Sequence, residues 1–341
     1  MVKSVKLADI AAELNVSVVT VSKALAGQKG VSEELRKKIK DLADEMGYTP
    51  IHGSRKEKSK SYTIGVISLE SYFAKFASFY WKMYQEIATS AVKKNCFTML
   101  EVISEQDVKS LQPPKLLQED KVDGIVIIGQ PSKEYLKLLY QYKKTPMIFL
   151  DFYDGEEDCD FVVSESYYGS YKVTNYLIRK GHRKIAYVGT LMSTESITDR
   201  YLGYRKALME AGIELREDWV IEDREKSGSR TIEKGYRFEL PSEMPTAFVC
   251  NNDITAYGVI KHLEEAGYRV PEDVSVVGYD DYLHPEYGDS KITTYAVDMA
   301  EMSRITLRNL IKKMENVTYN ESIHVVPGRL IERETVKDLN Q

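Results

Sequence analysis

Hydrophobic positions near the start of the chain repeat with the spacing of short helices. A first apolar face comprises four residues at i, i+3, i+4 and i+7: Leu7, Ile10, Ala11 and Leu14. The segment 15–17 interrupts this pattern, and Ser17 is suited to cap a second helix because its hydroxyl can accept a hydrogen bond from an unpaired amide. In that second helix, Val18, Val21 and Leu25 share one face. The pattern predicts two helices joined by a tight corner.

A third helical pattern follows, capped by Ser32 and stopped by Gly47. Its inward residues are Leu35, Ile39, Leu42 and Met46. Three helices with a tight corner between the first two are typical of a helix-turn-helix, whose second helix enters the DNA major groove. The alternative from the pattern alone is a small helical bundle that binds nothing.

The pattern changes after residue 61, where short apolar runs alternate with longer helical stretches. The runs are 63–67, 97–103, 124–128, 147–150, 184–188, 247–250 and 274–277. The helical stretches lie near 80–95, 132–143, 167–180, 199–211 and 253–266. This alternation predicts an α/β fold with parallel sheets covered by helices on both faces. Such sheets bind ligands beyond the carboxyl ends of their strands.

Charge is unevenly distributed along the chain. Residues 1–60 hold 12 Lys or Arg and 8 Asp or Glu, a net charge of +4, whereas the remainder carries −9. A basic head on an acidic body suits a head that contacts phosphates. The three cysteines are far apart, no apolar run approaches a membrane span, and no apolar leader opens the chain. We therefore expect a cytoplasmic protein with no membrane contact.

Catalytic and metal-binding motifs are absent from the sequence. It contains no nucleophile elbow, phosphate-binding loop, dinucleotide fingerprint or H-E-x-x-H pair, and its five histidines are scattered. We predict no enzyme activity, no catalytic residue, no metal site and no cofactor. Carboxylate chemistry assembled only by the fold stays open as an alternative.

Polar residues stand where predicted strands end, the place at which a parallel sheet binds small ligands. Asp151 follows 147–150, Asn252 follows 247–250, and Asp280 follows 274–277. Arg200 opens a helical stretch and can fork onto neighbouring hydroxyls. Charged partners for hydroxyls beside an apolar surface suit a sugar or polyol. The alternative for each residue is a helix cap or a surface ion pair.

The headpiece resembles that of the LacI/GalR family of bacterial transcriptional repressors. The matching stretches are Asp9-Ile10-Ala11, Val16-Ser17, Thr20 to Leu25, Val31 to Arg36 and Gly47-Tyr48-Thr49-Pro50. The body resembles the family's effector domain at 64–67, 122–125, 181–186, 200–205, 250–253, 276–281 and 329–335. The resemblance implies two doubly wound parallel-sheet lobes of the type I periplasmic-binding-protein kind, with ligand between them.

This resemblance also implies a domain plan. Residues 1–48 would be the helix-turn-helix headpiece, 49–61 a hinge or linker, and 62–341 the effector domain. Lobe one would take about 62–162 and 293–324. Lobe two would take about 163–292 and 325–341.

The same resemblance assigns site residues. For DNA it implies Ser17, Val18, Val19, Thr20, Ser22, Lys23 and Arg55. For the effector it implies Tyr80, Trp81, Asp151, Ser164, Glu165, Arg200, Asn252 and Asp280. Val18 and Val19 stand at base-reading positions and can pack only against thymine methyls, whereas Lys23 brings a point charge.

Three departures from the family concern the linker and the ligand. After Arg55 the family's apolar minor-groove residue is replaced by Lys56-Glu57, the loop 68–78 is longer than usual, and 223–228 lacks a common aromatic. A nucleobase or an amino acid therefore remains an alternative to a sugar. We predict a homodimeric, effector-responsive repressor that binds a pseudo-palindromic operator. The alternative is a transport or sensor protein with the same body.

Overall fold

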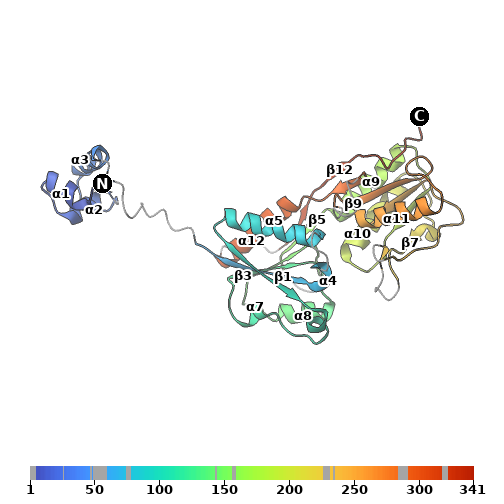
Figure 1. Cartoon of the computed structure of the whole chain (residues 1–341), viewed down its shortest axis with the longest axis horizontal. Coiled ribbons are helices and arrows are strands. Elements are labelled where there is room, and N and C mark those ends of the chain that lie inside the picture. Colours follow the sequence, from blue (N-terminus) through green and yellow to red (C-terminus); the bar gives the residue numbers. More distant parts are fainter. Residues whose placement is uncertain are drawn as a thin grey trace. The chain divides into compact units, whose positions relative to one another are not determined.

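The chain folds as two compact units, Met1–Ser61 and Tyr62–Gln341 (Figure 1). This computed structural model describes residues 5–25, 27–46, 48, 60–73, 78–142, 144–155, 159–225, 231–232, 235–282, 291–316 and 322–341. None of the described helices combines the length and the apolar character that a membrane span needs.

The first unit is a headpiece of three helices, α1 (Leu7–Glu13), α2 (Val18–Leu25) and α3 (Glu33–Glu45). Each helix contributes two fully buried side chains to its core: Ile10, Ala11, Val21, Ala24, Ile39 and Ala43. Val18 was predicted to share a face with Val21, but Val18 is 45% exposed whereas Val21 is fully buried. Val18 is the first residue of α2, and the buried residues of this helix are Val21 and Ala24.

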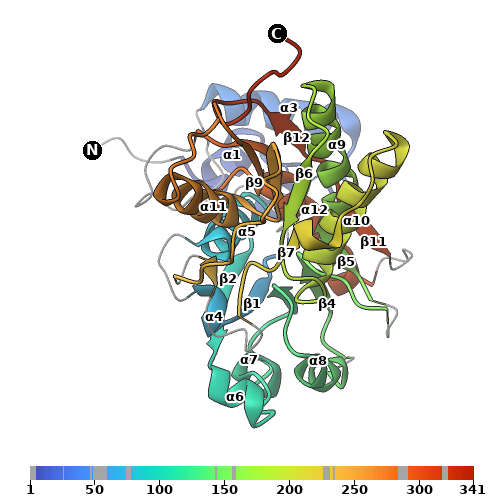
Figure 2. The ribbon, with the colours of Figure 1, turned by 90° about the vertical axis from the view of Figure 1, so that its right-hand side faces the viewer.

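The larger unit contains two six-stranded sheets, each the centre of one lobe (Figure 2). The first sheet has the order β11-β5-β4-β3-β1-β2 and is parallel throughout. Its strands are β1 (Thr63–Leu69), β2 (Phe97–Ile103), β3 (Gly124–Ile128), β4 (Met147–Leu150), β5 (Phe161–Ser164) and β11 (Ile323–Val326). Its helices are α4 (Glu70–Phe73), α5 (Phe79–Lys93), α6 (Glu105–Lys109), α7 (Lys115–Gln118), α8 (Lys133–Tyr140) and α12 (Met299–Met314).

The second sheet has the order β12-β10-β9-β8-β6-β7, with only β12 antiparallel to its neighbour. Its strands are β6 (Ile185–Val188), β7 (Val220–Ile221), β8 (Ala247–Cys250), β9 (Ser275–Asp280), β10 (Thr293–Ala296) and β12 (Arg329–Ile331). The helices of this lobe are α9 (Ser166–Arg179), α10 (Glu195–Glu210), the 3-10 turn η1 (Glu217–Trp219) and α11 (Asp253–Glu265).

The central strands of both sheets are buried on both faces, which explains their continuous apolar sequences. In β3, Val126 and Ile128 pack under α5 and α12, whereas Ile125 and Ile127 pack under α7 and α8. In the second lobe, α11 covers one face and α9 with α10 covers the other. Successive residues of a strand point to opposite faces, so a strand covered on both sides is apolar at every position.

The chain passes between the lobes three times, after β5, after β10 and after β11. The predicted lobe boundaries need correction here, because 293–296 was expected in lobe one. These residues form β10, which pairs with β9 in the second sheet from Thr293↔Val277 to Ala296↔Asp280. Residues 163–164 and 325–326 likewise belong to the first sheet, in β5 and β11.

One tyrosine joins the three crossovers. The Tyr295 hydroxyl donates to Glu165 Oε2 at 2.8 Å and accepts from the Gly328 amide at 3.2 Å. Glu165 follows β5, Tyr295 lies in β10, and Gly328 precedes β12. A Cβ at Gly328 would lie 2.1 Å from the Ala296 carbonyl oxygen, so only glycine allows this approach.

Candidate functional site

The second helix of the headpiece presents the residues expected to contact DNA. Val18 and Val19 are 45% and 62% exposed, and Ser17, Ser22 and Lys23 are also exposed. Ser17 Oγ accepts the Thr20 amide at 3.0 Å and also contacts the Thr20 hydroxyl at 2.8 Å, so Ser17 caps α2. Arg55 lies outside the described residues.

Arg36 of α3 holds the carboxyl end of α2. Its NH1 donates to the carbonyl oxygens of Ala24 at 3.0 Å and Lys23 at 3.4 Å. Its NH2 donates to the carbonyl oxygens of Gln28 at 2.8 Å and Val31 at 3.5 Å. The carbonyl groups at a helix end lack partners within the helix and favour a positive charge. Arg36 therefore uses its charge inside the headpiece.

A second candidate site lies in the larger unit, centred on Arg200 of α10. The side chain of Arg200 is buried, with NH1 donating to the Asn251 carbonyl oxygen at 2.6 Å and NH2 to Asp280 Oδ1 at 3.1 Å. Its guanidinium lies 3.7 Å from the ring centre of Tyr279. Stacking and two directed hydrogen bonds fix the orientation of this cation.

Asp151, from the other lobe, belongs to the same electrostatic cluster. It follows β4 and accepts a hydrogen bond from the Tyr80 hydroxyl. Burial raises the pKa of Asp151 to about 6, although Arg200 and Tyr80 both oppose the rise. Burial also raises the pKa of Asp280 to about 7, with the Asp151 charge adding to the effect and Arg200 opposing it.

Both carboxylates stand on unusual backbone. Asp151 has φ +71° and Asp280 has φ +103°, in the region that side-chain-bearing residues rarely adopt. Such conformations cost about 1–3 kcal/mol each and gather at binding and catalytic sites. The two aspartates are therefore held in place by the surrounding fold at an energetic cost.

Aromatic side chains surround this cluster. The rings of Tyr72 and Tyr80 lie 4.5 Å apart, and the Tyr72 hydroxyl donates to the Gln130 carbonyl oxygen at 2.7 Å. Phe79 of the first lobe meets Tyr282 of the second, with ring centres 6.0 Å apart. The Tyr153 hydroxyl also crosses between the lobes, donating to the Asp199 carboxylate at 3.0 and 3.1 Å. Rings and carboxylates from both lobes thus face one region.

Four predicted effector residues lie elsewhere or are engaged in structural contacts. Asn252 caps α11, since its Oδ1 accepts the Thr255 amide at 2.8 Å. Glu165 accepts from Tyr295 at a lobe crossover, and Ser164 contacts Ser166 at 3.3 Å. Trp81 packs against Phe73 and Tyr84 rather than against the Asp151 cluster. Trp81 follows Tyr80 in α5, and successive side chains of a helix point about 100° apart, so the two residues face different surroundings.

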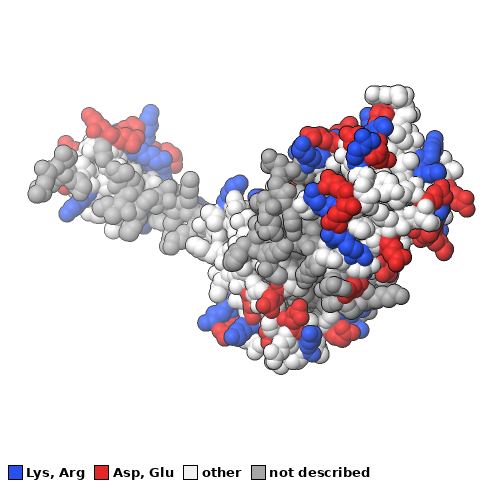
Figure 3. Space-filling model, turned by 45° about the vertical axis from the view of Figure 1, so that its right-hand side comes forward, with Lys and Arg blue, Asp and Glu red and all other residues white. Residues whose placement is uncertain are grey.

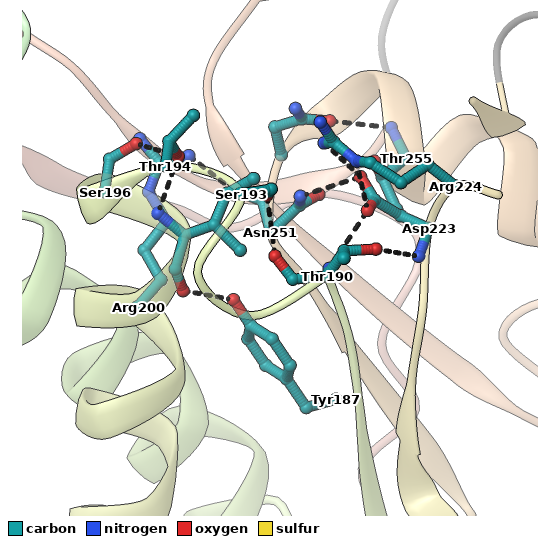
Figure 4. A network of polar contacts seen from close by, with 12 residues as sticks. Tyr187, Thr190, Ser193, Thr194, Ser196, Arg200, Asp223, Arg224, Asn251 and Thr255 are labelled. Atoms are coloured by element: carbon teal, nitrogen blue, oxygen red, sulfur yellow. Dashed lines mark hydrogen bonds and ion pairs between the residues drawn. The ribbon is translucent and has the colours of Figure 1, made fainter. Parts of the chain in front are cut away.

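Sequence reasoning missed a polar group at the ends of β6, β7 and β8. Asp223 lies between Thr190, Arg224 and Asn251 (Figure 4). The Asn251 amide group donates to Asp223 Oδ2 at 3.0 Å, and Asn251 is fully buried. The only sequence signal was its place after the short run Val220–Ile221. Thr190 and Asn251 lie 33 and 28 positions away from Asp223, so sequence spacing could not reveal these two contacts.

The charges of this interior region contrast with the outer surface. Figure 3 shows acidic and basic side chains interspersed over the visible face of the larger unit. Within the described part of the chain, no group of three or more His, Cys, Asp or Glu side chains could hold a metal ion. Two arginines in this region pair with aspartates. Arg200 pairs with Asp280 at 3.1 Å and stacks on the Tyr279 ring, and Arg224 pairs with buried Asp223 at 2.9 Å. This arrangement is suited to hydroxyl groups and other polar ligand atoms.

Family models match both units of the chain. Residues 6–50 match the bacterial regulatory proteins of the lacI family, and residues 174–336 match a periplasmic binding protein-like domain. The chain is 30% identical over 343 residues to the HTH-type transcriptional repressor PurR of Escherichia coli O1:K1 / APEC, covering 97% of this chain and 96% of the relative. It is 29% identical over 338 residues to PurR of Pectobacterium carotovorum subsp. carotovorum (strain PC1), with the same coverage.

Solved structures share the fold over most of the chain. A transcriptional regulator CelR–cellobiose complex has a TM-score of 0.68 at 24% identity, covering 97% of this chain and 99% of its own. A lac repressor dimer bound to operator and the anti-inducer ONPF has a TM-score of 0.64 at 22% identity, covering 98% and 100%. A regulator from Enterococcus faecium with bound ribose has a TM-score of 0.65 at 26% identity, covering 81% and 99%. The expected headpiece and two-lobed α/β body are confirmed, and the relatives are repressors rather than enzymes.

Proposed function

Because this chain belongs to the lacI family of bacterial transcriptional repressors, we propose that its effector is a sugar or sugar derivative bound between the two lobes. The protein is a repressor with a DNA-binding headpiece and an effector domain. Effector binding changes the relation of the lobes and shifts operator affinity. A coupling of about 1–3 kcal/mol is typical of such switches.

The pairing of Arg200 with Asp280, opposite Asp151, is the observation that carries this proposal. Carboxylates accept hydrogen bonds from vicinal hydroxyls, and a fixed guanidinium donates to their oxygens. Tyr72 and Tyr80 add flat apolar surface beside the polar groups. The ribose bound by the Enterococcus faecium relative supports a sugar as the effector.

A transport or sensor protein with the same body was the alternative. The headpiece argues against it, because residues 6–50 match the DNA-binding part of the family and its exposed helix presents Val18 and Val19. The repressor acts in the bacterial cytoplasm, where its operator is.

Asp280→Asn tests the effector site. Asparagine is chosen over alanine because it tolerates the φ of +103° and keeps the shape of the side chain. Losing one charged partner of a buried polar ligand costs about 2–5 kcal/mol, so calorimetry should show effector affinity reduced by about 30-fold or more. Operator binding without effector should survive.

Asp281→Asn is the matched control. Asp281 also has positive φ, but its carboxylate pairs with Arg333 at 2.7 Å. Its replacement should leave effector affinity within a factor of about two. Equal affinity of Asp280→Asn and the unchanged protein would refute the placement of the effector. A thermal-shift screen of sugars and phosphorylated sugars supplies the ligand, since saturation at 100 Kd stabilises by about 2.7 kcal/mol.

The homodimer is proposed from an exposed apolar edge on the first lobe. Strand β2 ends the sheet, and its side chains Phe97, Met99 and Val102 are 67%, 41% and 43% exposed. Val92 of the preceding helix is 72% exposed. An unpaired edge with large apolar side chains is typical of an association surface. Two headpieces would then read half-sites about 34 Å apart.

A further inference from the structure

A row of polar side chains follows the carboxyl edge of the second sheet. Asp280 ends β9, Asn251 follows β8, Thr190 follows β6, and Arg224 follows β7. These strands are neighbours in the order β9-β8-β6-β7. Three strand spacings separate the first residue from the last, about 14 Å at the backbone. The row has a carboxylate at one end and a guanidinium at the other.

Asp223 fixes the guanidinium of Arg224 at this far end. Arg224 Nε donates to Asp223 Oδ1 and NH2 donates to Oδ2, both at 2.9 Å. Asp223 also accepts from the Thr190 amide at 3.0 Å and from the Asn251 side chain at 3.0 Å. Burial opposes ionisation of Asp223, but its bonds to Arg224 and Thr190 outweigh this and lower the pKa. The carboxylate is therefore charged and fully engaged.

The bonds to Asp223 use one edge of the Arg224 guanidinium, and NH1 with the second N–H of NH2 forms the other edge. The two bonds to Asp223 come from Nε and NH2, and the Arg224 side chain retains 24% exposure. The positive charge of Arg224 lowers the pKa of the Tyr72 hydroxyl in the first lobe, and the negative charge of Asp151 raises it. Arg224 thus borders the same region as Asp151 and Asp280, from the opposite end of the row.

We propose that Arg224 reads an anionic group of the effector, a carboxylate or a phosphate, while Asp280 and Arg200 hold its hydroxyl-bearing part. This inference rests on the proposed effector site and specifies the ligand class as an acidic sugar derivative. Guanidinium groups have only donors and match the paired oxygens of carboxylate and phosphate. Ionised carboxylates have only acceptors and match hydroxyl donors. The ligand therefore has donors at one end and charged acceptors at the other.

The sequence 223–228 contains no aromatic residue, and it supplies Arg224, whose guanidinium is held by Asp223. An aromatic ring offers an apolar face to the ligand, whereas an aspartate-held guanidinium offers two parallel N–H donors. An apolar ligand end would leave these donors without partners after water is expelled, which is unfavourable. The site therefore discriminates against neutral, apolar groups at this end.

The test compares neutral sugars with their acidic counterparts by calorimetry. Glucose, glucuronate and glucose 6-phosphate form one set, and ribose with ribose 5-phosphate forms another. Charged hydrogen bonds of this kind predict that an acidic member binds at least about tenfold more tightly than its neutral counterpart. Preference for glucuronate or for the sugar phosphates identifies the anion as a carboxylate or a phosphate.

Arg224→Gln should abolish this preference without changing operator binding in the absence of effector. Arg224→Lys keeps the charge but not the fork, so we expect it to retain only part of the preference. Arg237→Gln is the control, because Arg237 pairs with Glu265 at 3.5 Å near the end of α11. It should leave the ratio of acidic to neutral affinity unchanged.

Two results would overturn this inference. In the first, neutral sugars bind as tightly as acidic ones and Arg224→Gln has no effect, while Asp280→Asn still abolishes binding. The proposed effector site would then stand, but Arg224 would not bind an anionic group. The second result concerns inorganic phosphate and applies if none of the tested sugars binds. Excess inorganic phosphate should still raise the melting temperature of the unchanged protein more than that of Arg224→Gln, and equal shifts would refute an anion site at Arg224.

Discussion

Replacing Arg36 by glutamine should impair operator recognition without removing a phosphate contact. Arg36 makes four hydrogen bonds to the carbonyl oxygens of Lys23, Ala24, Gln28 and Val31, at 3.4, 3.0, 2.8 and 3.5 Å. Its side chain is only 12% exposed. All four acceptors lie at the end of α2 or in the turn that follows it. Arg36 is therefore a positioning residue for the helix that presents Val18 and Val19.

The expected magnitude follows from the two shorter bonds. Hydrogen bonds from a charged donor contribute about 1.5–3 kcal/mol each, and bonds made by one side chain are not additive. We expect the free energy of unfolding of the headpiece to fall by about 2–3 kcal/mol. A headpiece of this size has little stability in reserve, so the carboxyl end of α2 should lose its fixed orientation. Operator affinity should fall by at least about tenfold.

The assay measures operator and non-specific affinity at several salt concentrations. A residue that contacts a phosphate contributes about 0.9 to the slope of log affinity against log salt. Because Arg36 is engaged within the headpiece, Arg36→Gln should leave this slope unchanged while lowering the ratio of operator to non-specific affinity. Arg36→Lys should be nearly as damaging, because lysine lacks the fork.

Lys38→Gln is the control for Arg36→Gln, since Lys38 lies on α3 and pairs only with exposed Glu34 at 3.0 Å. It should change the unfolding free energy by less than about 0.5 kcal/mol. The reasoning fails if Arg36→Gln lowers the salt slope by one contact and Arg36→Lys restores it. Arg36 would then act on DNA directly.

Three other predictions concern DNA sequence, assembly and pH. Val19→Gln should change the preferred operator sequence, with about 1–3 kcal/mol of binding free energy separating preferred from rejected bases. If a binding-site selection returned the same consensus for both proteins, the assignment of α2 as the recognition helix would be wrong. Phe97→Glu should shift the protein toward monomer in sedimentation, and an unchanged dimer would exclude the β2 edge. Because the folded protein raises the pKa of Asp151 to about 6 and of Asp280 to about 7, it holds more protons than the unfolded chain between pH 4 and 7. The free energy of unfolding should therefore fall as pH rises through this window. Effector affinity should rise as the two carboxyl groups ionise and should level off above about pH 8. A pH-independent affinity would show that these carboxylates do not contact the ligand.

The central strands β3, β4 and β8 could be predicted because burial on both faces makes them apolar at every position. Residues 97–103, 124–128, 147–150 and 247–250 were predicted with the bounds that the structure has. Strands β10 and β12 contain threonine or arginine, which breaks the apolar pattern, and they were not predicted; β10 pairs with β9, and β12 pairs with β10. Their place in the second lobe depends on distant partners, which local periodicity cannot reveal.

The sequence predicted those residues of the candidate site that stand at or near the ends of strands. Arg200, Asp151 and Asp280 belong to one cluster because strand ends of both lobes meet there. Asn252 also follows a strand, but an asparagine before a helix equally serves as its cap, and the structure shows that contact. The Asp223–Arg224 pair escaped notice because its orientation depends on Thr190 and Asn251 from other strands.

The tyrosine shared by the three crossovers restricts how the lobes can move. Because Tyr295 bonds to Glu165 and to Gly328, the three connecting segments are tied at one point rather than spread along a broad boundary. Segments tied at a single point permit rotation of one rigid body against another but resist sliding. A ligand that draws Asp280 and Asp151 together would therefore produce one angular displacement of the first lobe.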